Sequence, residues 1–112
     1  MKNLVILIGN VGNKPENISK TSNKAVTFSL ATNERFKDKN GDKQQITDWH
    51  NIKVFNGLSG FALDYLDKGS TVEVQGRLKT DKYEDREGNT RYATYVLADE
   101  ILLLDKKIGP AE

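Results

Sequence analysis

Alternation of side-chain character recurs through most of this 112-residue chain and restricts its fold more than any other feature. In residues 25–32, Val26, Phe28 and Leu30 fall at every second position, with smaller side chains between them. Successive side chains of an extended strand point to opposite faces, so a period of two predicts strands buried on one face. The same period is present in residues 46–55, 71–83 and 91–104. We therefore expect a fold built mainly from β-strands.

Turn-forming residues separate the predicted strands. An apolar run over residues 4–11 is the first strand, with a bend or bulge at its glycines and a loop over residues 17–23 after it. Residues 33–45 are charged and contain Asn40-Gly41, a dipeptide suited to the positive φ angles of a tight hairpin turn. A second polar tip over residues 84–89 joins the last two strands. Two hairpins are thus predicted.

One segment has helical rather than extended periodicity. Its apolar side chains fall at i, i+3, i+4, i+7 and i+8, which places them on one stripe of a short helix. They are Leu58, Phe61, Ala62, Tyr65 and Leu66. Gly69 follows where a left-handed C-terminal cap is expected. The order predicts an all-β, five-stranded oligonucleotide-binding barrel with the helix between strands three and four; an immunoglobulin-like sandwich needs more strands and no central helix.

The composition agrees with one globular domain. With 37% hydrophobic and 29% charged residues, the chain is too apolar for disorder, and no segment is long enough to span a bilayer. The apolar run after Lys2 is too short for a secretory leader. Cysteine is absent, which excludes disulfides and thiolate metal sites and permits a reducing compartment. We assign residues 1–107 to the domain and residues 108–112 to a short C-terminal remnant without an acidic tail.

The strand over residues 46–55 has two different faces. One face carries Trp49, Asn51, Lys53 and Phe55, with aliphatic side chains in the gaps. Planar rings beside a cation suit a ligand with flat faces and negative charge, such as single-stranded nucleic acid. The alternative is that Trp49 and Phe55 are core residues of a strand buried on both faces, although Asn51 and Lys53 would be unfavourable there.

Two further aromatic residues, Phe36 and Tyr83, lie in or beside the predicted hairpins. They either cover a ligand or pin each hairpin onto the barrel, and the residue pattern leaves both interpretations open. Arg77 and Lys79 share strand parity with Tyr83. This parity favours a second face with cationic and aromatic side chains.

Charge is balanced overall but unevenly distributed. The net charge of +1 is low for a protein that binds phosphates. Residues 1–53 carry nine Lys or Arg against five Asp or Glu, a net charge of +4, and residues 54–112 carry eight against eleven, a net charge of −3. Lys37, Lys39 and Lys43 alternate with aspartates, so each alone is typical of a solvated hairpin, and only as a group do they favour contact with a phosphate backbone.

The remaining chemistry-bearing residues do not indicate catalysis. His50 is the only histidine and has the opposite parity to Trp49, which favours a structural or interface role. An acidic cluster in and beside the second hairpin turn raises the alternative of a metal-dependent nuclease, but no histidine is nearby. The cluster consists of Asp81, Glu84, Asp85 and Glu87. We expect no enzymatic activity, metal site or cofactor.

Several motifs follow one another in a specific order. They are Val5-Ile6-Leu7-Ile8-Gly9-Asn10-Val11-Gly12 with Pro15-Glu16, Ser29-Leu30-Ala31-Thr32, Thr47-Asp48-Trp49-His50, Tyr65-Leu66-Asp67-Lys68-Gly69-Ser70 and Val74-Gln75-Gly76-Arg77-Leu78. In this order they resemble the bacterial single-stranded DNA-binding protein family, whose members are homotetramers with the oligonucleotide-binding fold. The resemblance spans about residues 4–104. It implies a protein that coats single-stranded DNA in the cytoplasm, at the nucleoid, during replication, recombination and repair.

The resemblance also implies roles for individual residues. Phe36, Trp49, Phe55 and Tyr83 match the four family positions where aromatic side chains stack on bases, and Phe36 and Tyr83 stand where tryptophan is common. The expected DNA-binding set is Phe36, Lys37, Trp49, Asn51, Lys53, Phe55, Arg77, Lys79, Tyr83 and Arg91. His50 matches a subunit-interface position, and the first strand is expected to help pair subunits. The expected interface set is Leu4, Ile6, Ile8 and His50.

Full-length replicative members continue into a flexible linker and an acidic tip ending in Phe, which recruits replication and repair enzymes. Residues 108–112 contain neither feature, so the resemblance does not extend to recruitment through such a tail. Two other functions stay open, namely a protein-interaction module of the replisome or primosome and single-stranded RNA binding, which shares the same stacking physics. A docking module need not retain four aromatic residues at stacking positions, and their presence favours nucleic-acid binding.

Overall fold

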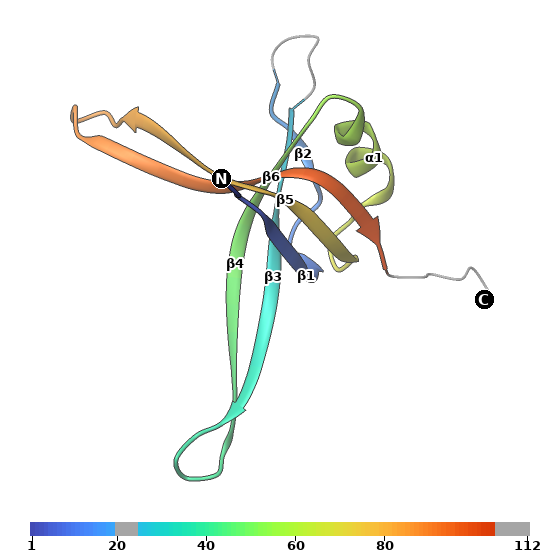
Figure 1. The fold of residues 1–112 in the computed structure, drawn as a ribbon, viewed down its shortest axis with the longest axis vertical. Helices are drawn as coiled ribbons and strands as arrows, with labels where there is room; N and C mark the ends of the chain where they lie inside the picture. The colour runs from blue at the N-terminus through green and yellow to red at the C-terminus, as the bar shows by residue number, and fades with distance from the viewer. Residues whose placement is uncertain (20–24, 105–112) are drawn as a thin grey trace, which may run out of the picture.

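A computed structural model describes residues 1–19 and 25–104. The elements of this part of the chain are β1 (Val5–Val11), β2 (Glu16–Asn17), β3 (Ala25–Lys37), β4 (Lys43–Phe55), α1 (Gly57–Tyr65), β5 (Thr71–Glu84) and β6 (Thr90–Leu103). Figure 1 shows two hairpins that project from a central barrel, β3–β4 downward and β5–β6 to the left. α1 lies on the right of the barrel in the same view.

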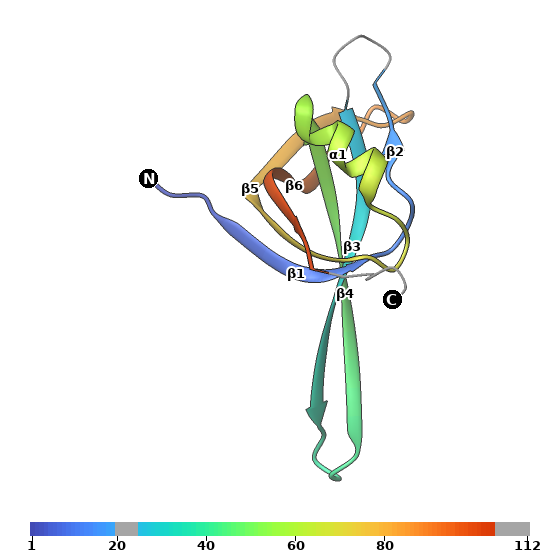
Figure 2. The ribbon, with the colours of Figure 1, turned by 90° about the vertical axis from the view of Figure 1, so that its right-hand side faces the viewer.

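Strand β1 closes the barrel. The strand order is β1-β5-β6-β4-β3, and β1 pairs with β3 as well, at Asn10↔Ala31 and Val11↔Leu30. β4 and β6 run parallel and pair at two positions, whereas the other pairs are antiparallel. α1 lies over one end of the barrel, as Figure 2 shows. The predicted five-stranded barrel, with one helix between its third and fourth long strands, is confirmed; β2 adds a two-residue pairing to β3.

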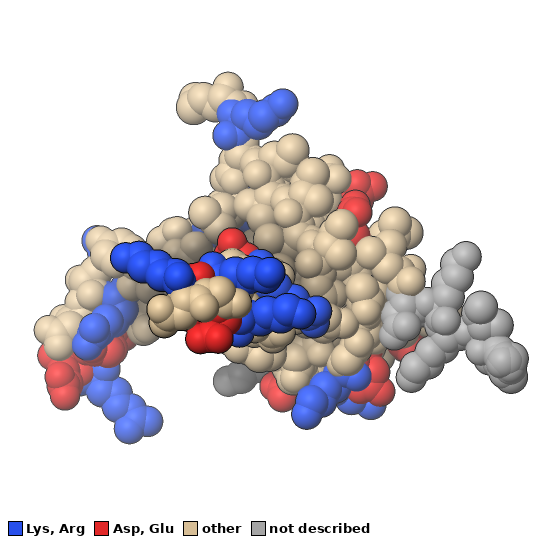
Figure 3. Space-filling view, turned by 90° about the horizontal axis from the view of Figure 1, so that it is seen from below, with Lys and Arg blue, Asp and Glu red and all other residues tan. Residues whose placement is uncertain are grey.

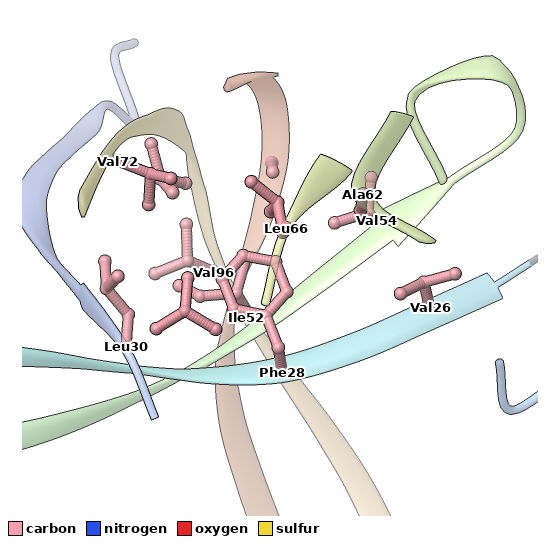
Figure 4. Packing of buried hydrophobic residues seen from close by; sticks show 12 residues of the cluster. Val26, Phe28, Leu30, Ile52, Val54, Ala62, Leu66, Val72 and Val96 are labelled. Atoms are coloured by element: carbon pink, nitrogen blue, oxygen red, sulfur yellow. The ribbon is translucent and has the colours of Figure 1, made fainter. Parts of the chain in front are cut away.

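The inner faces of the strands form the core. Val26, Phe28 and Leu30 of β3 are buried, as their spacing predicted. Burial of one such side chain contributes roughly 1.5–3 kcal/mol. Figure 4 shows the side chains that they meet inside the barrel. These include Ile52, Val54, Ala62, Leu66, Val72 and Val96.

The predicted hairpin over residues 33–45 is confirmed. β3 continues to Lys37 and β4 begins at Lys43, so the arms of this hairpin, residues 33–37 and 43–45, are paired extensions of the two strands. Both faces of this ribbon are solvated, so its sequence shows no alternation. The predicted tight turn is present and is closed by a hydrogen bond from the Gly41 N–H to the Asp38 carbonyl, but only Gly41, with a φ of 81°, and not Asn40 has a positive φ.

The tips of the two long hairpins share one turn structure. In each, an aspartate Oδ1 accepts hydrogen bonds from the backbone N–H groups two and four residues later, and the glycine three residues later has a φ of 81°. The two turns start at Asp38 and Asp85. The Asp42 N–H chiefly lowers the pKa of the Asp38 carboxyl, and the Arg91 side chain chiefly lowers that of Asp85. The two turns share an Asp-x-x-Gly spacing in the sequence, which is the local signal for this turn structure.

The helix is shorter than its apolar stripe indicated. α1 ends at Tyr65, and Leu66 already has an extended backbone. Ala62 and Leu66 are buried, but Tyr65 is 64% exposed and its ring packs on that of Phe61, so its predicted core position is wrong. Gly69 has a positive φ, yet it lies in the following turn, which the Ser70 N–H to Asp67 C=O hydrogen bond closes, rather than at the helix cap.

The loop predicted over residues 17–23 begins later in the structure. Asn17, expected in a loop, belongs to β2. Residues 20–23 of that predicted loop, the domain boundary at residue 107 and the remnant over residues 108–112 lie outside the described residues. No helix among the described residues has the length and apolar character needed to cross a membrane.

Strand β5 leaves the barrel after Gly76. The β5–β6 register shifts between Gln75 and Gly76, and a Cβ on Gly76 would collide with the Leu97 carbonyl oxygen. Val74 is fully buried, whereas Leu78, predicted to face the same way, is 48% exposed. The reason is that Leu78 already lies in the projecting part of the hairpin, beyond the core.

We predict that Gly76→Ala lowers the free energy of unfolding by about 1–3 kcal/mol, because backbone rather than a flexible side chain occupies the space for a Cβ. The matched control is Gly60→Ala inside α1, where a Cβ meets open space. This control is expected to raise stability by about 0.5–1 kcal/mol. Equilibrium denaturation in guanidinium measures both values, and equal effects of the two substitutions would contradict the prediction.

Candidate nucleic-acid interface

Trp49 and Phe55 are exposed on the outer face of β4, which also carries Asn51 and Lys53 and is here called the β4 face. Their exposed fractions are 62% and 41%, while the aliphatic side chains between them are fully buried. Their cross-strand neighbours on β3 are small, since Ala31 pairs with Trp49 and Ala25 pairs with Phe55. Small neighbours leave the ring faces uncovered. The alternative that these two rings belong to the core is therefore wrong.

A glycine after β1 supports the Trp49 ring. A Cβ built on Gly12 would collide with the indole ring and with the Ser29 hydroxyl, so the ring lies directly against Gly12. The Gly12 N–H donates to the Ser29 carbonyl at 2.8 Å, and Asn13 Oδ1 accepts from the Ser29 N–H at 2.9 Å and from its hydroxyl at 2.6 Å. From the sequence, Gly12 was assigned only to a bend. Its contact with Trp49, 37 positions away in the printed sequence, was not predicted.

Lys53 lies further along the β4 face and reaches residues of β5 and β6. Its Nζ is 4.2 Å from the centroid of the Tyr95 ring and 3.9 Å from Oδ2 of Asp81. The Tyr95 hydroxyl donates to Asp81 Oδ1 at 3.3 Å. Burial of Tyr95 and the nearby Asp81 charge raise the pKa of this hydroxyl. Tyr95 was absent from the predicted set, although its strand parity with Arg91 is a signal that could have identified it.

Strands β4 and β6 are paired over only a short stretch. They pair only at Ile52↔Val96 and Lys53↔Leu97. A hollow lies next to this short pairing, between β4 and the β5–β6 hairpin. Its lining residues are Trp49, His50, Asn51, Leu78, Thr94, Tyr95 and Val96. The hollow thus joins the exposed Asn51 on the β4 face to the side chains of the second hairpin.

The β5–β6 hairpin brings the second predicted face together. Arg77, Lys79 and Tyr83 share one side of the ribbon, and Tyr83 is 51% exposed. Their partners in register on β6 are Leu97, Tyr95 and Arg91. Because directly paired residues of antiparallel strands point to the same side, Arg91 lies beside Tyr83. The predicted parity of this group agrees with the register.

The tip of the β3–β4 hairpin carries basic residues and Phe36. Phe36 and Trp49 lie on opposite sides of this two-stranded ribbon. Phe36 is 42% exposed and pairs with Gln44, while Lys37 pairs with Lys43. A surface hollow at this tip is lined by Arg35, Phe36, Lys37, Lys43, Gln44 and Gln45. Figure 3 views the molecule from below, where the hairpin projects toward the reader and Lys and Arg side chains gather in the middle. By alternation, Lys37 rather than Phe36 shares the side that carries Trp49.

The predicted interface residues lie on other surfaces. His50 is half-buried, and its Nε2 is 2.9 Å from the Thr32 hydroxyl. Leu4, Ile6 and Ile8 point outward from or just before β1, with exposed fractions between 52% and 57%. His50 belongs to β4, whereas these three side chains belong to β1 or to the residue before it.

The acidic cluster does not converge on one point. Asp81 contacts Lys53 and Tyr95, whereas Asp85 holds its turn and Arg91, with Nε at 3.0 Å from Oδ2. Within the described part of the chain, no group of three or more His, Asp or Glu side chains is arranged to hold a metal ion. The acidic residues thus act through separate local contacts.

Together, the closed barrel and the exposed rings on β4 define an oligonucleotide-binding fold with an aromatic and cationic outer face. A family profile described as the Single-strand binding protein family matches residues 2–104. The chain belongs to this family, as its motifs predicted.

Individual relatives agree with this assignment. The single-stranded DNA-binding protein of Xylella fastidiosa is 41% identical over 103 residues, which is 91% of this chain and 63% of that protein. That of Xanthomonas axonopodis pv. citri is 42% identical over 103 residues, 91% of this chain and 57% of its own length. The chain therefore spans about three-fifths of these two relatives. A solved structure described as the Plasmodium falciparum SSB complex with ssDNA has a TM-score of 0.82 and 34% identity, and the match covers 94% of this chain and 96% of the other.

We predict that Gly12→Ala displaces the Trp49 ring, because the added methyl group must occupy space that the indole fills. The chain has one tryptophan, so its fluorescence emission reports this change directly. We expect a shifted emission maximum and a loss of roughly 1–3 kcal/mol in unfolding free energy. Gly60→Ala, whose Cβ meets nothing, is the control that leaves emission unchanged. An unaltered spectrum for Gly12→Ala would show that the ring does not depend on Gly12.

Proposed function

We propose that the chain binds single-stranded DNA with little sequence preference, by stacking bases on aromatic rings and contacting phosphates with Lys and Arg. The observation that carries the proposal is the exposure of Trp49 and Phe55 on a face that also presents Lys53. Stacking on one ring contributes about 1–3 kcal/mol per base and tolerates any base. The relatives named for single-stranded DNA binding and the match to a complex with ssDNA support the same ligand.

In this proposal the residues act in three groups. Trp49 and Phe55 stack bases along the β4 face, with Asn51 beside them. Tyr83 continues the path on the β5–β6 hairpin with its basic neighbours. At the β3–β4 hairpin, Lys37 extends the side that carries Trp49, and Phe36 offers a ring on the other side of the ribbon. The basic neighbours on β5 and β6 are Arg77, Lys79 and Arg91. The role is one of coating DNA during replication, recombination and repair, at the nucleoid in the cytoplasm, and needs no catalytic group.

To test this, a fluorescent oligothymidine is titrated with the unmodified chain and with a Trp49→Ala, Phe55→Ala double variant. Loss of two stacking platforms is expected to weaken binding by about 2–6 kcal/mol. Binding of the unmodified chain should weaken as salt rises, because phosphate contacts release counterions. Tyr65→Ala removes an exposed ring from α1, outside the β4 face, and is the matched control.

Thermal unfolding of each variant verifies that the barrel is intact. Equal affinity for a duplex of the same length would contradict the proposal. An RNA oligomer of the same base composition serves as a third ligand, and tighter binding to it than to DNA would identify RNA as the ligand instead.

We infer that copies of this chain associate through β1, as homotetramers do in the family. Along residues 5–9, β1 pairs with β5, and no other described strand lies at its second edge. Ile6 and Ile8 are more than half exposed there, and Leu102 of β6 continues the apolar surface across Glu73 of β5. An unpaired strand edge beside exposed apolar side chains favours association with a second strand.

We predict that the unmodified chain sediments as a tetramer and that Ile6→Asp with Ile8→Asp sediments as a smaller species. Charged side chains at an apolar interface lose hydration without gaining partners, which opposes association. Ile46→Asp alters another exposed isoleucine, in the β3–β4 hairpin, and is expected to leave the tetramer intact. A monomeric unmodified chain in analytical ultracentrifugation would exclude the inferred association.

A further inference from the structure

Three cations of the expected DNA-binding set already have carboxylate partners. Within residues 1–19 and 25–104, the ion pairs are Lys53–Asp81 at 3.9 Å, Arg77–Asp99 at 3.9 Å and Arg91–Asp85 at 3.0 Å. A surface that binds a polyanion is normally expected to leave its cations available to phosphates. Here each of the three faces an aspartate of the same chain.

Two of these aspartates lie where the backbone of the β5–β6 hairpin is irregular. Asp85 Oδ1 accepts the backbone hydrogen bonds that shape the β5–β6 turn. Asp99 is the extra residue where the β5–β6 register shifts, since Gln75 pairs with Glu100 and Gly76 pairs with Ala98. Substitution of Asp85 would alter backbone structure as well as charge, and Asp99 lies in an irregular part of the ladder.

Asp81 is different. Its contacts in the described structure are with the Lys53 ammonium group and the Tyr95 hydroxyl, and neither is a backbone group. It lies in the regular part of β5, where it pairs with Ala93 of β6. The backbone there does not require a carboxylate, because no turn or cap depends on it.

The Lys53–Asp81 pair lies at the β4 face, where its charges act on an approaching phosphate. Lys53 belongs to the β4 face between Asn51 and Phe55, and its side chain is 31% exposed. The Asp81 side chain is 55% exposed, so the carboxylate is the more accessible member of the pair. The Tyr95 ring lies 4.2 Å from the ammonium group and restricts its position. A phosphate that approaches Lys53 therefore meets the negative charge of Asp81.

We propose that Asp81 is an affinity-setting residue of the β4 face, whose carboxylate holds Lys53 in the free chain and is replaced by a DNA phosphate on binding. This inference rests on the proposed function. Binding then replaces the Lys53–Asp81 ion pair with a Lys53–phosphate ion pair. The phosphate contact with Lys53 therefore adds less affinity than a contact with an unpaired lysine would. In addition, Asp81 stays beside the bound strand and repels it, and salt screens this repulsion.

The test compares Asp81→Asn with the unmodified chain in titrations of fluorescent oligothymidine at several salt concentrations. Asparagine keeps the size of the side chain and can still accept a hydrogen bond from the Tyr95 hydroxyl. We expect binding to be roughly threefold to tenfold tighter at about 50 mM salt, with a smaller gain at about 200 mM and a steeper salt dependence. Asp64→Asn on α1 makes the same change in net charge away from β4 and is expected to leave the affinity nearly unchanged.

A second comparison tests whether the effect operates through Lys53. In a Lys53→Gln background, Asp81→Asn is expected to give a smaller gain, because the lysine that it would free is absent. An undiminished gain in that background overturns the proposal, as does an equal gain from Asp64→Asn. Unaltered binding by Asp81→Asn removes this inference alone, whereas absence of oligothymidine binding by the unmodified chain removes the proposed function and this inference together.

Discussion

Closure of the barrel depends on close backbone approach at two glycines. A Cβ on Gly9 of β1 would collide with the Ala31 carbonyl oxygen of β3, and one on Gly76 of β5 would collide with that of Leu97 on β6. The first approach lies where β1, paired with β5, crosses to pair with β3, and the second lies at the β5–β6 register shift. Closure gives every long strand a fixed inner side, and because side chains alternate, it also fixes which residues point outward. The exposure of the β4 face is therefore a consequence of the closed sheet.

The sequence predicted the barrel well where one face of a strand is buried, and poorly where no face is. The spacing of Val26, Phe28 and Leu30 identified the inner side of β3 correctly. The polar continuation of the same strand over residues 33–37 has solvent on both sides, so burial imposes no pattern on it. Leu78 was misplaced for a related reason, since alternation gives the side of a strand but not the point at which the strand leaves the core. Helical spacing likewise could not reveal that α1 ends at Tyr65, whose side chain is exposed, or that Leu66 is buried from an extended backbone after the helix.

The candidate site was predictable to the extent that it is local. Parity within ten residues placed Trp49 and Phe55 on one side, and their exposure agrees with it. The contacts that support and restrict these side chains join distant parts of the chain. Gly12 lies under Trp49, and Asp81 lies beside Lys53, in arrangements that only the folded sheet creates. Periodicity within one strand does not reveal such pairs, and so the contacts of Gly12 with Trp49 and of Asp81 with Lys53 were not predicted.

These contacts bear on how a chain of nearly zero net charge can hold a polyanion. The net charge is +1, and three cations of the expected binding set are already paired internally. Binding by cations alone falls steeply with salt, because it is driven by counterion release. Stacking on an uncovered ring depends on contact between flat apolar faces, which salt screens little. Under the proposed function, a surface with exposed rings and internally paired cations is expected to gain most of its affinity from the rings, while its ion pairs set how strongly the remainder responds to salt.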